Sequence, residues 1–392
     1  MFRLRHAFAA LSLLAAAPVF PAGLEVRFHP DKKLYAYEIE ARRGLASVLL
    51  QNASIVNVSP APITVERVEI DLLGGGTPAE PTVSLHLGAA DLDKSAARGA
   101  ALEAQGILAA LAFQFRPDRL LAGAKLSPGR ELPPGGAILL GQKPLVFAGE
   151  PSALRLRAFG RSADGTPVET SGALPIDLGG TKLEYSFPLA GRWFVAAGAT
   201  FHTGHRWAVP EEFALDVLRV GEEGNSHRGD GTKRGDYLAY GQEIRAAAAG
   251  TVIAALGTVA ESDDDFRRPG ETLEAYQQRV LENQGKILAA GIEKAAGNYL
   301  VIDHGNGEFS FYAHLKTGSL KVEKGAKVER GQPIALLGTS GNSTEPHLHF
   351  QVNDGADPFL SAGIPIRFQG IEIPWSDSPR NLQSGDMVVA GR

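Results

Sequence analysis

The 392-residue chain contains no cysteine, so it forms no disulfide bonds and offers no thiolate to a metal ion. Its stability must come from buried apolar area and from any metal that the folded chain binds. Metal chemistry is restricted to histidine, aspartate and glutamate ligands.

The chain also lacks an excess of positive charge. The formal net charge is −5 and aromatic residues make up 7% of the chain, which excludes the broad basic surface that holds nucleic acids. We therefore predict no nucleic-acid partner. The remaining composition, 44% hydrophobic and 21% charged, is ordinary for a globular protein, and the length is sufficient for two domains.

Beyond the N-terminus, no stretch is long and apolar enough to cross a membrane. The opening "MFRLRHAFAALSLLAAAPVFPAG" has two arginines, a short apolar run and then small residues. This layout is typical of a secretory signal that is cleaved near Ala17 or Ala22. We predict a signal peptide over residues 1–22, a periplasmic or secreted location, and no integral membrane span after signal removal. The alternative is an uncleaved anchor or a buried helix.

Residues 23–180 show the pattern of a β-sandwich domain. Apolar runs are broken at short intervals by Asn, Ser, Pro and Gly, and Leu154 and Leu156 alternate with Arg155 and Arg157. This spacing favours an antiparallel, immunoglobulin-like sandwich. The Ala- and Leu-rich stretch 91–115 predicts a helix inserted in the sandwich or packed on it. His29 and His86 stand alone in this region, so neither is assigned a role.

Residues 181–375 again predict strands separated by Gly-containing turns, and 376–392 is predicted to be a C-terminal tail. The stretch "VIDHGNGEFSFYAHL" predicts a hairpin that turns at residues 304–307. Residues 261–297 interrupt this domain with an acidic opening and then a helix from about Glu271. We interpret them as a solvated surface insertion. The functional alternative is a lid or docking surface beside a cleft.

Two histidines flank one leucine in "STEPHLHFQV", residues 343–352. In a strand, His347 and His349 point to the same face, about 6–7 Å apart, and Leu348 points to the other. Burying two unpartnered imidazoles is costly, and a metal or a substrate would remove that cost. An isolated pair is more often part of a core or a surface, so the interpretation depends on ligands from elsewhere in the chain.

Further ligands are available upstream. In "EEFALDVL", Asp216 lies among apolar residues, where a carboxylate is costly unless a cation or several hydrogen bonds hold it. His202 and His205 precede it. One of these histidines, Asp216 and His349 can form a three-ligand zinc site with an open fourth position.

His314 and His347 are then left to act on the substrate. A zinc hydrolase needs a group that takes a proton from water and a donor that stabilises the oxyanion, and imidazole suits both tasks. The chain has no H-E-x-x-H helix, so a glutamate base of that design is absent.

The segments "HR…FALD", "GTVIAA", "GNYLVIDHGNGEFSFYAHL" and "VERGQPIALLGTSGNSTEPHLHF" resemble the lysostaphin/LytM-type zinc metalloendopeptidases over about residues 185–358. The resemblance implies a largely antiparallel β domain that cleaves peptides, most often in peptidoglycan. It implies one zinc ion, with ligands that map onto His205, Asp216 and His349. The two remaining histidines of the family pattern map onto His314 and His347, which position and deprotonate water and stabilise the tetrahedral intermediate.

The chain departs from this family in one respect. Relatives often carry the first two ligands as H-x-x-x-D, whereas ten residues separate His205 from Asp216 here. His202 is therefore an alternative ligand, although His205 is favoured. His227 with Asp230 could mimic a ligand pair, but this segment is interpreted as a loop, and His304 is interpreted as structural.

The sequence thus predicts a mainly β protein, with an exported zinc endopeptidase acting on peptidoglycan stem peptides or cross-bridges. Two alternatives stay open. One is a non-catalytic module of the same fold that binds the wall or activates a hydrolase; the other is a secreted protease for Gly-rich protein substrates. The sequence does not determine the oligomeric state or the bond that is cleaved.

Overall fold

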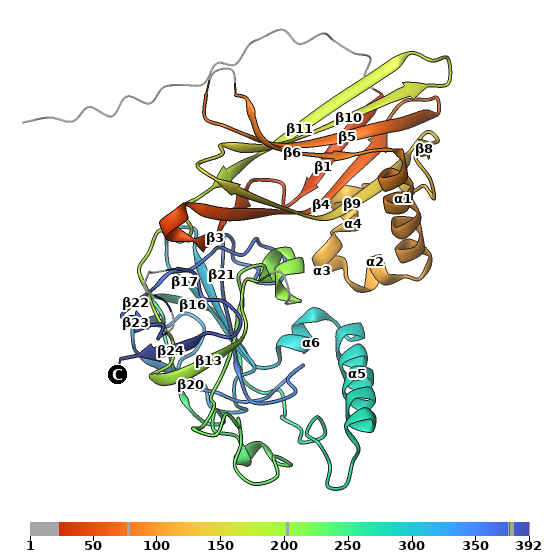
Figure 1. The fold of residues 1–392 in the computed structure, drawn as a ribbon. Coiled ribbons are helices and arrows are strands. Elements are labelled where there is room, and N and C mark those ends of the chain that lie inside the picture. Colours follow the sequence, from red (N-terminus) through yellow and green to blue (C-terminus); the bar gives the residue numbers. More distant parts are fainter. Residues whose placement is uncertain (1–22, 77–78, 201–203, 375, 377–379, 392) are drawn as a thin grey trace, which may run out of the picture.

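A computed structural model of the protein describes residues 23–76, 79–200, 204–374, 376 and 380–391. The predicted signal peptide, the alternative ligand His202 and part of the predicted tail lie outside the described residues. The described part is mainly β, as predicted, and forms two bodies stacked along the long dimension of the molecule (Figure 1). Within it, no helix is both long enough and apolar enough to cross a membrane.

The N-terminal body consists of two facing sheets. One has the order β1-β4-β9-β7, with β3 beside β4, and the other has the order β2-β11-β10-β5-β6, with β8 beside β5. Their bounds are β1 Leu24–His29, β3 Tyr37–Glu40, β4 Leu45–Asn57, β7 Lys125–Leu126, β9 Gly136–Ala148, β2 Leu34–Tyr35, β5 Ile63–Leu73, β6 Pro81–Leu87, β8 Glu131–Leu132, β10 Ala153–Ser162 and β11 Pro167–Asp177. Apolar residues of both sheets share one core, so the sandwich architecture is present. Its immunoglobulin-like character stays a prediction.

The alternation predicted for β10 is present in the structure. Leu154 and Leu156 are fully buried in the sandwich core, whereas Arg155 faces the other way. Arg155 lies opposite Asp71 of β5 and donates to its carboxylate, with 2.8 Å between Nη2 and Oδ2. Opposite charges on facing strands therefore support the outer face, while leucines fill the inner one.

The predicted helix over 91–115 is divided into shorter helices. They are α1 Ala89–Ala104, α2 Ile107–Ala110 and α3 Ala112–Phe115, followed by α4 Pro117–Leu120. The break comes at Gly106, whose φ of 72° lies in the left-handed region that glycine adopts easily and a helix cannot continue through. As a result, α2 and α3 turn away from α1 toward the second body (Figure 1).

The C-terminal body is built on one antiparallel sheet with the order β19-β16-β17-β18-β21-β14-β13-β24-β23. The bounds are β13 Gly191–Ala197, β14 Leu215–Leu218, β16 Gly250–Leu256, β17 Tyr299–Asp303, β18 Phe309–Ala313, β19 Lys327–Val328, β21 Leu348–Asn353, β23 Ile371–Glu372 and β24 Met387–Ala390. Two short sheets accompany it, β12 Tyr185–Ser186 with β22 Phe368–Gln369, and β15 Glu243–Arg245 with β20 Pro333–Leu336. The predicted hairpin is β17–β18. The predicted tail contributes β24, which pairs with β13 inside the sheet.

The insertion over 261–297 contains α5 Leu273–Ala289 and α6 Ile292–Ala296. The Thr272 hydroxyl caps α5 by accepting from the amide of Ala275. No side chain of α5 is fully buried, and Leu281 is 65% exposed. The preferred interpretation as a solvated surface insertion therefore fits α5, which stands at the edge of the molecule (Figure 1). Four short 3₁₀ segments, Ala41–Arg43, His205–Trp207, Val209–Glu211 and Arg234–Asp236, are labelled η1 to η4.

His29, at the end of β1, is a buried histidine whose two ring nitrogens have no hydrogen-bond partner. Burial, assisted by the positive charges of Arg116 and Arg119, lowers its pKa to about 4. The unfolded chain binds this proton near pH 6.5, whereas the folded chain resists it until about pH 4. The resistance of His29 to protonation therefore costs no stability at neutral pH, and stability is lost as the pH falls through this window.

We expect His29 protonation to lower the free energy of unfolding by about 3 kcal/mol between pH 7 and pH 4. Urea unfolding of the wild type and of His29→Gln at both pH values measures this contribution, because groups shared by the two proteins cancel in the difference. An equal pH dependence in the two proteins would contradict the assignment.

Candidate metal and catalytic site

The candidate site lies on three neighbouring strands of the large sheet, β18, β21 and β14. The register places His349 of β21 opposite Asp216 of β14 on one side and opposite Ala313 of β18 on the other. His314 follows β18 directly. Strand pairing therefore brings together residues from distant parts of the chain.

The alternation predicted around Leu348 also holds. Leu348 is fully buried in the apolar core of this body, and His347 and His349 lie on the opposite side, beside Asp216. His205 comes from η2, outside the sheet. Its Nε2 is 3.4 Å from Asp216 Oδ2, and its ring is 5.0 Å from the His349 ring.

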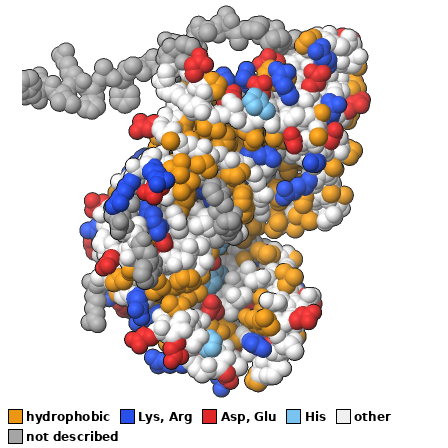
Figure 2. Space-filling model, in the orientation of Figure 1, with side chains coloured by type: hydrophobic (Ala, Val, Ile, Leu, Met, Phe, Trp, Pro, Cys, Tyr) orange, Lys and Arg blue, Asp and Glu red, His pale blue; other side chains and the backbone are white. Residues whose placement is uncertain are grey.

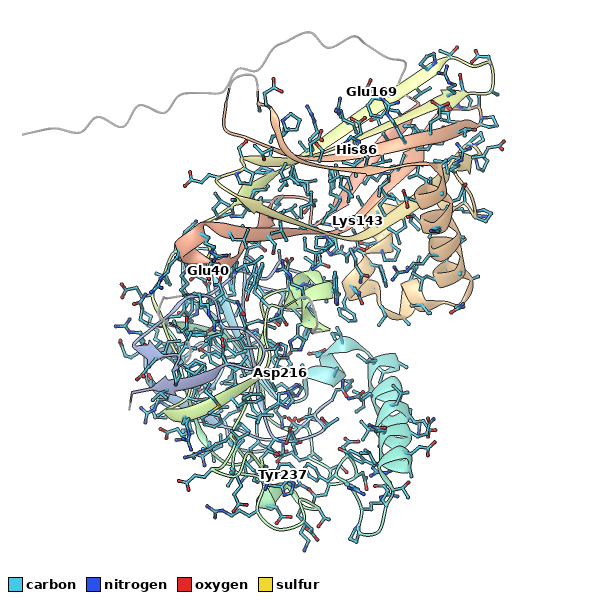
Figure 3. All side chains as sticks on the ribbon, in the orientation of Figure 1. Glu40, His86, Lys143, Glu169, Asp216 and Tyr237 are labelled. Atoms are coloured by element: carbon cyan, nitrogen blue, oxygen red, sulfur yellow. The ribbon has the colours of Figure 1, made fainter. Side chains whose placement is uncertain are left out.

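One ligand atom from each of His205, Asp216 and His349 lies within 4.8 Å of the others. Thus the structure brings together the three residues that the sequence predicts as ligands. Figure 3 labels Asp216, which lies at the inner end of the space between α3 and α6. His202 lies outside the described residues.

The hydrogen bonds of His349 test whether this cluster suits a metal ion. Gln351 donates from Nε2 to the carbonyl of Pro358, so its Oε1 accepts from His349 Nε2 at 2.8 Å. The His349 Nδ1 lone pair is then directed at Asp216 Oδ1, 3.0 Å away. Two acceptors at this distance need a proton or a cation between them.

The electrostatics follow from the same geometry. Burial disfavours charge on both His349 and Asp216. At His349 the hydrogen bond and the charge of the Asp216 carboxylate outweigh burial and raise the pKa of the imidazole to about 9. For Asp216, burial is outweighed by the imidazoles of His205, His347 and His349, which hold the pKa of the carboxyl well below its usual range. His205 Nδ1 is buried and has no hydrogen-bond partner among the described residues. This set of nitrogen and oxygen donors fits a divalent metal such as zinc.

His314 is oriented by the backbone. Its Nδ1 donates to the carbonyl oxygen of Ser340 at 2.9 Å, which leaves the lone pair of the neutral ring on Nε2. The backbone of His314 has a φ of 59°, a left-handed conformation that is uncommon outside glycine and concentrates at functional sites. Burial, assisted by His347 and His349, places the pKa of His314 well below 6.5.

His347 is held in the same manner. Its Nδ1 donates to the carbonyl oxygen of Glu345 at 2.8 Å, and its Nε2 lies 3.6 Å from Asp216 Oδ1. The rings of His314 and His347 are 4.6 Å apart. The two histidines predicted to be catalytic therefore lie side by side next to the ligand cluster, and each has one nitrogen engaged by a backbone carbonyl.

A cleft of about 430 Å³ opens over these residues. The α2–α3 segment of the sandwich forms one wall through Leu111, Phe113 and Gln114, and the insertion forms another through Leu288 and Ile292. Histidine surface is visible in the hollow between these two parts of the molecule (Figure 2). The insertion thus borders the cleft and leaves room for a peptide, while its role as a lid or docking surface stays a prediction.

The loop that carries His205 is held by the sandwich. The neighbouring Arg206 is fully buried and forms an ion pair with Glu212 at 2.8 Å. Gln51 of β4 donates to the carbonyl of Arg206 at 2.7 Å, and Arg206 donates to the hydroxyl of Ser47 at 3.3 Å. The N-terminal body therefore fixes the backbone next to one of the candidate ligands.

The remaining histidines of the described part of the chain lie outside the ligand cluster. His304 contacts the carbonyl of Ala249 and the hydroxyl of Ser310, at 2.8 and 2.9 Å, which agrees with a structural role. His227 lies against the Tyr237 ring rather than in the cluster. Sequence reasoning missed Glu211, Gln351 and Ser340, because none of them carries a recognisable motif.

Comparison with known proteins identifies part of this body. Residues 280–360 match the model of Peptidase family M23, a segment that contains His314, His347 and His349. The peptidoglycan DD-endopeptidase ShyA of Vibrio cholerae is 41% identical over 105 residues, which cover 27% of this chain and 22% of ShyA. ShyB of the same organism is 47% identical over 85 residues, covering 21% of this chain and 19% of ShyB.

The murein hydrolase activator EnvC of Escherichia coli is 35% identical over 68 residues, covering 17% of this chain and 16% of EnvC. The chain thus spans about a fifth of the length of each of these relatives. Among solved structures, the catalytic domain of lysostaphin from Staphylococcus simulans is 16% identical, with a TM-score of 0.24 over 44% of this chain and 88% of that domain, too low to support an inference. On the sequence matches, residues 280–360 are similar to peptidase family M23, which confirms the predicted resemblance to the lysostaphin/LytM-type endopeptidases for this segment.

Proposed function

We propose that the protein is an exported zinc metalloendopeptidase that hydrolyses peptide bonds in peptidoglycan stem peptides or cross-bridges. The observation that carries this proposal is the convergence of five side chains, His205, Asp216, His314, His347 and His349, at the base of one cleft. The names of the relatives ShyA and ShyB support peptidoglycan as the substrate. The signal predicted over residues 1–22 supports export.

His205, Asp216 and His349 would hold one zinc ion. When bound, zinc supplies Lewis acidity, which polarises a peptide carbonyl and lowers the pKa of water. The protein's own contribution is a rigid ligand set, because two ligands belong to paired strands and the third directly precedes Arg206, whose backbone is fixed by buried contacts. Gln351 adds orientation, since its amide oxygen fixes which nitrogen of His349 faces Asp216.

His314 and His347 would handle protons. Each donates its Nδ1 hydrogen to a backbone carbonyl, so Nε2 is the nitrogen available to the substrate. A neutral imidazole can accept a proton from attacking water, and a protonated one can donate to the developing oxyanion or to the leaving amine. Two such rings, 4.6 Å apart, can share these tasks in place of the glutamate base that the chain lacks.

The main alternative is a non-catalytic module that activates a separate hydrolase. The match to EnvC, named a murein hydrolase activator, favours it. The open cleft of about 430 Å³ and the complete set of five side chains favour an enzyme. A protease for Gly-rich proteins is a further alternative, because the same site chemistry would serve it.

Digestion of purified sacculi by the full chain tests the proposal. We expect soluble cross-linked peptides to be released, release to stop with a metal chelator, and zinc to restore it. Parallel digestion of a Gly-rich polypeptide separates the two substrate classes. Intact sacculi together with a cleaved polypeptide would favour the protein protease, and two intact substrates would favour the activator.

A further inference from the structure

The titratable side chains that line the cleft are histidines and carboxylates. Apart from the proposed metal, histidines supply its possible positive charge, since none of the described residues that line it is lysine or arginine. Two carboxylates line it, Asp216 and Glu211.

The two carboxylates differ in their partners. Asp216 is surrounded by His205, His347 and His349 and belongs to the ligand cluster. Glu211 is not part of the group of ligand atoms that lie within 4.8 Å of one another. Among the described residues, its side chain has no ion pair and no hydrogen bond. It is half-buried, so its charge is incompletely solvated.

The position of Glu211 is fixed by its surroundings. It ends η3, and the next residue, Glu212, forms the buried ion pair with Arg206. On the other side, Asn353 of β21 donates to the carbonyl of Pro210 at 2.9 Å. The backbone of Glu211 is therefore held at the cleft by rigid neighbours, which limits the positions that its carboxylate can reach.

A partly desolvated carboxylate that forms no hydrogen bond or ion pair with the described residues favours a cationic group in its ligand. Its negative charge also acts at longer range on the imidazole of His349. Away from the proposed metal, the cleft offers a ligand carboxylate no lysine or arginine partner among its described lining residues. Within a peptide, the cation that fits is a primary ammonium, which donates three hydrogen bonds.

We infer that Glu211 is a specificity-determining residue that binds a free primary ammonium group of the substrate, such as the side-chain amine of a diamino acid near the scissile bond. The inference rests on the proposed peptidase function. It extends that function by stating that the preferred peptide is positively charged where it meets Glu211.

The test compares one substrate in two chemical forms. Cross-linked muropeptides are purified from sacculi, and half of the sample is treated with acetic anhydride so that every free amine becomes a neutral amide. The ratio of kcat/KM for the amine form to that for the acetylated form is measured for wild type, Glu211→Gln and Glu222→Gln. Glu222 is an exposed glutamate that does not line the cleft, so it is the matched control.

We expect wild type and Glu222→Gln to prefer the amine form by about tenfold, the size of one charge-assisted hydrogen bond. In Glu211→Gln the ratio should fall to about one. Calorimetric binding of both forms to metal-free wild type and Glu211→Gln gives a second readout that requires no turnover. Thermal unfolding confirms that the variants are folded.

The outcomes separate the two proposals. Equal ratios in wild type and Glu211→Gln, in cleavage and in binding, would overturn the inference while leaving the peptidase function intact. Equal loss of activity on both forms in Glu211→Gln, with or without loss of zinc, would also overturn it, because Glu211 would then belong to the catalytic machinery. If wild type cleaves nothing but binds the amine form more tightly through Glu211, the peptidase function fails and the ammonium site stands.

Discussion

His314→Ala should bind zinc as the wild type does and release peptides from sacculi about 1,000-fold more slowly. The reason is that His314 is expected to transfer protons and not to hold the metal, and positioned acid–base groups contribute roughly 100- to 10,000-fold to rates. Its Nδ1 is engaged by the Ser340 carbonyl at 2.9 Å, and the ring lies 4.6 Å from that of His347. Single-turnover release of soluble peptides, together with the zinc content of the purified protein, measures both effects.

The matched control is His86→Ala. His86 is exposed on β6 of the sandwich, far from the labelled Asp216 (Figure 3). This variant should release peptides at the wild-type rate. A wild-type rate in His314→Ala would contradict the proton-transfer role, and a loss of zinc in that variant would make His314 a ligand instead.

Asp216→Asn should lose zinc and, with it, all hydrolysis above background. The carboxylate is the central group of the cluster, 3.0 Å from His349 Nδ1 and 3.4 Å from His205 Nε2. Asparagine keeps the shape but removes the negative charge that compensates a dication among buried imidazoles. Because loss of groups that merely orient a ligand costs 10- to 100-fold in affinity, loss of a ligand should weaken zinc binding by more than about 100-fold.

Zinc titration with a competing chelator measures this affinity. Asp230→Asn is the control, since Asp230 lies in the exposed loop beside His227 and its Oδ1 accepts from Thr232. It should bind zinc as the wild type does. The same titration of His205→Ala and His202→Ala identifies the third ligand. Retention of tight zinc binding by Asp216→Asn would place the metal elsewhere.

Much of the candidate site could be predicted because its signals are local. Two histidines spaced by one residue in a strand share a face, and an aspartate in an apolar strand needs a partner. These local patterns indicate Asp216, His347 and His349 as candidate site residues. The family resemblance then separated the roles, with His205 as a ligand and with His314 and His347 as the histidines that act on the substrate.

The remaining features depend on contacts that no local pattern encodes. Asp216 and His349 lie 133 residues apart in sequence, and only the pairing of β14 with β21 places them opposite each other. The cleft wall formed by Leu111 and Phe113 arises because the helical segment breaks at Gly106 and its end turns toward the second body. Glu211 resembles any surface glutamate until the cleft around it is known.

The contacts that Arg206, next to His205, makes with the N-terminal body have a mechanical consequence. Two of the candidate ligands are carried by strands of one sheet, whereas the third adjoins Arg206, which contacts Ser47 and Gln51 of the other body. A movement that separated the two bodies would pull on one ligand and leave the other two in place. The affinity of the protein for the metal would then depend on how tightly the two bodies are packed against each other.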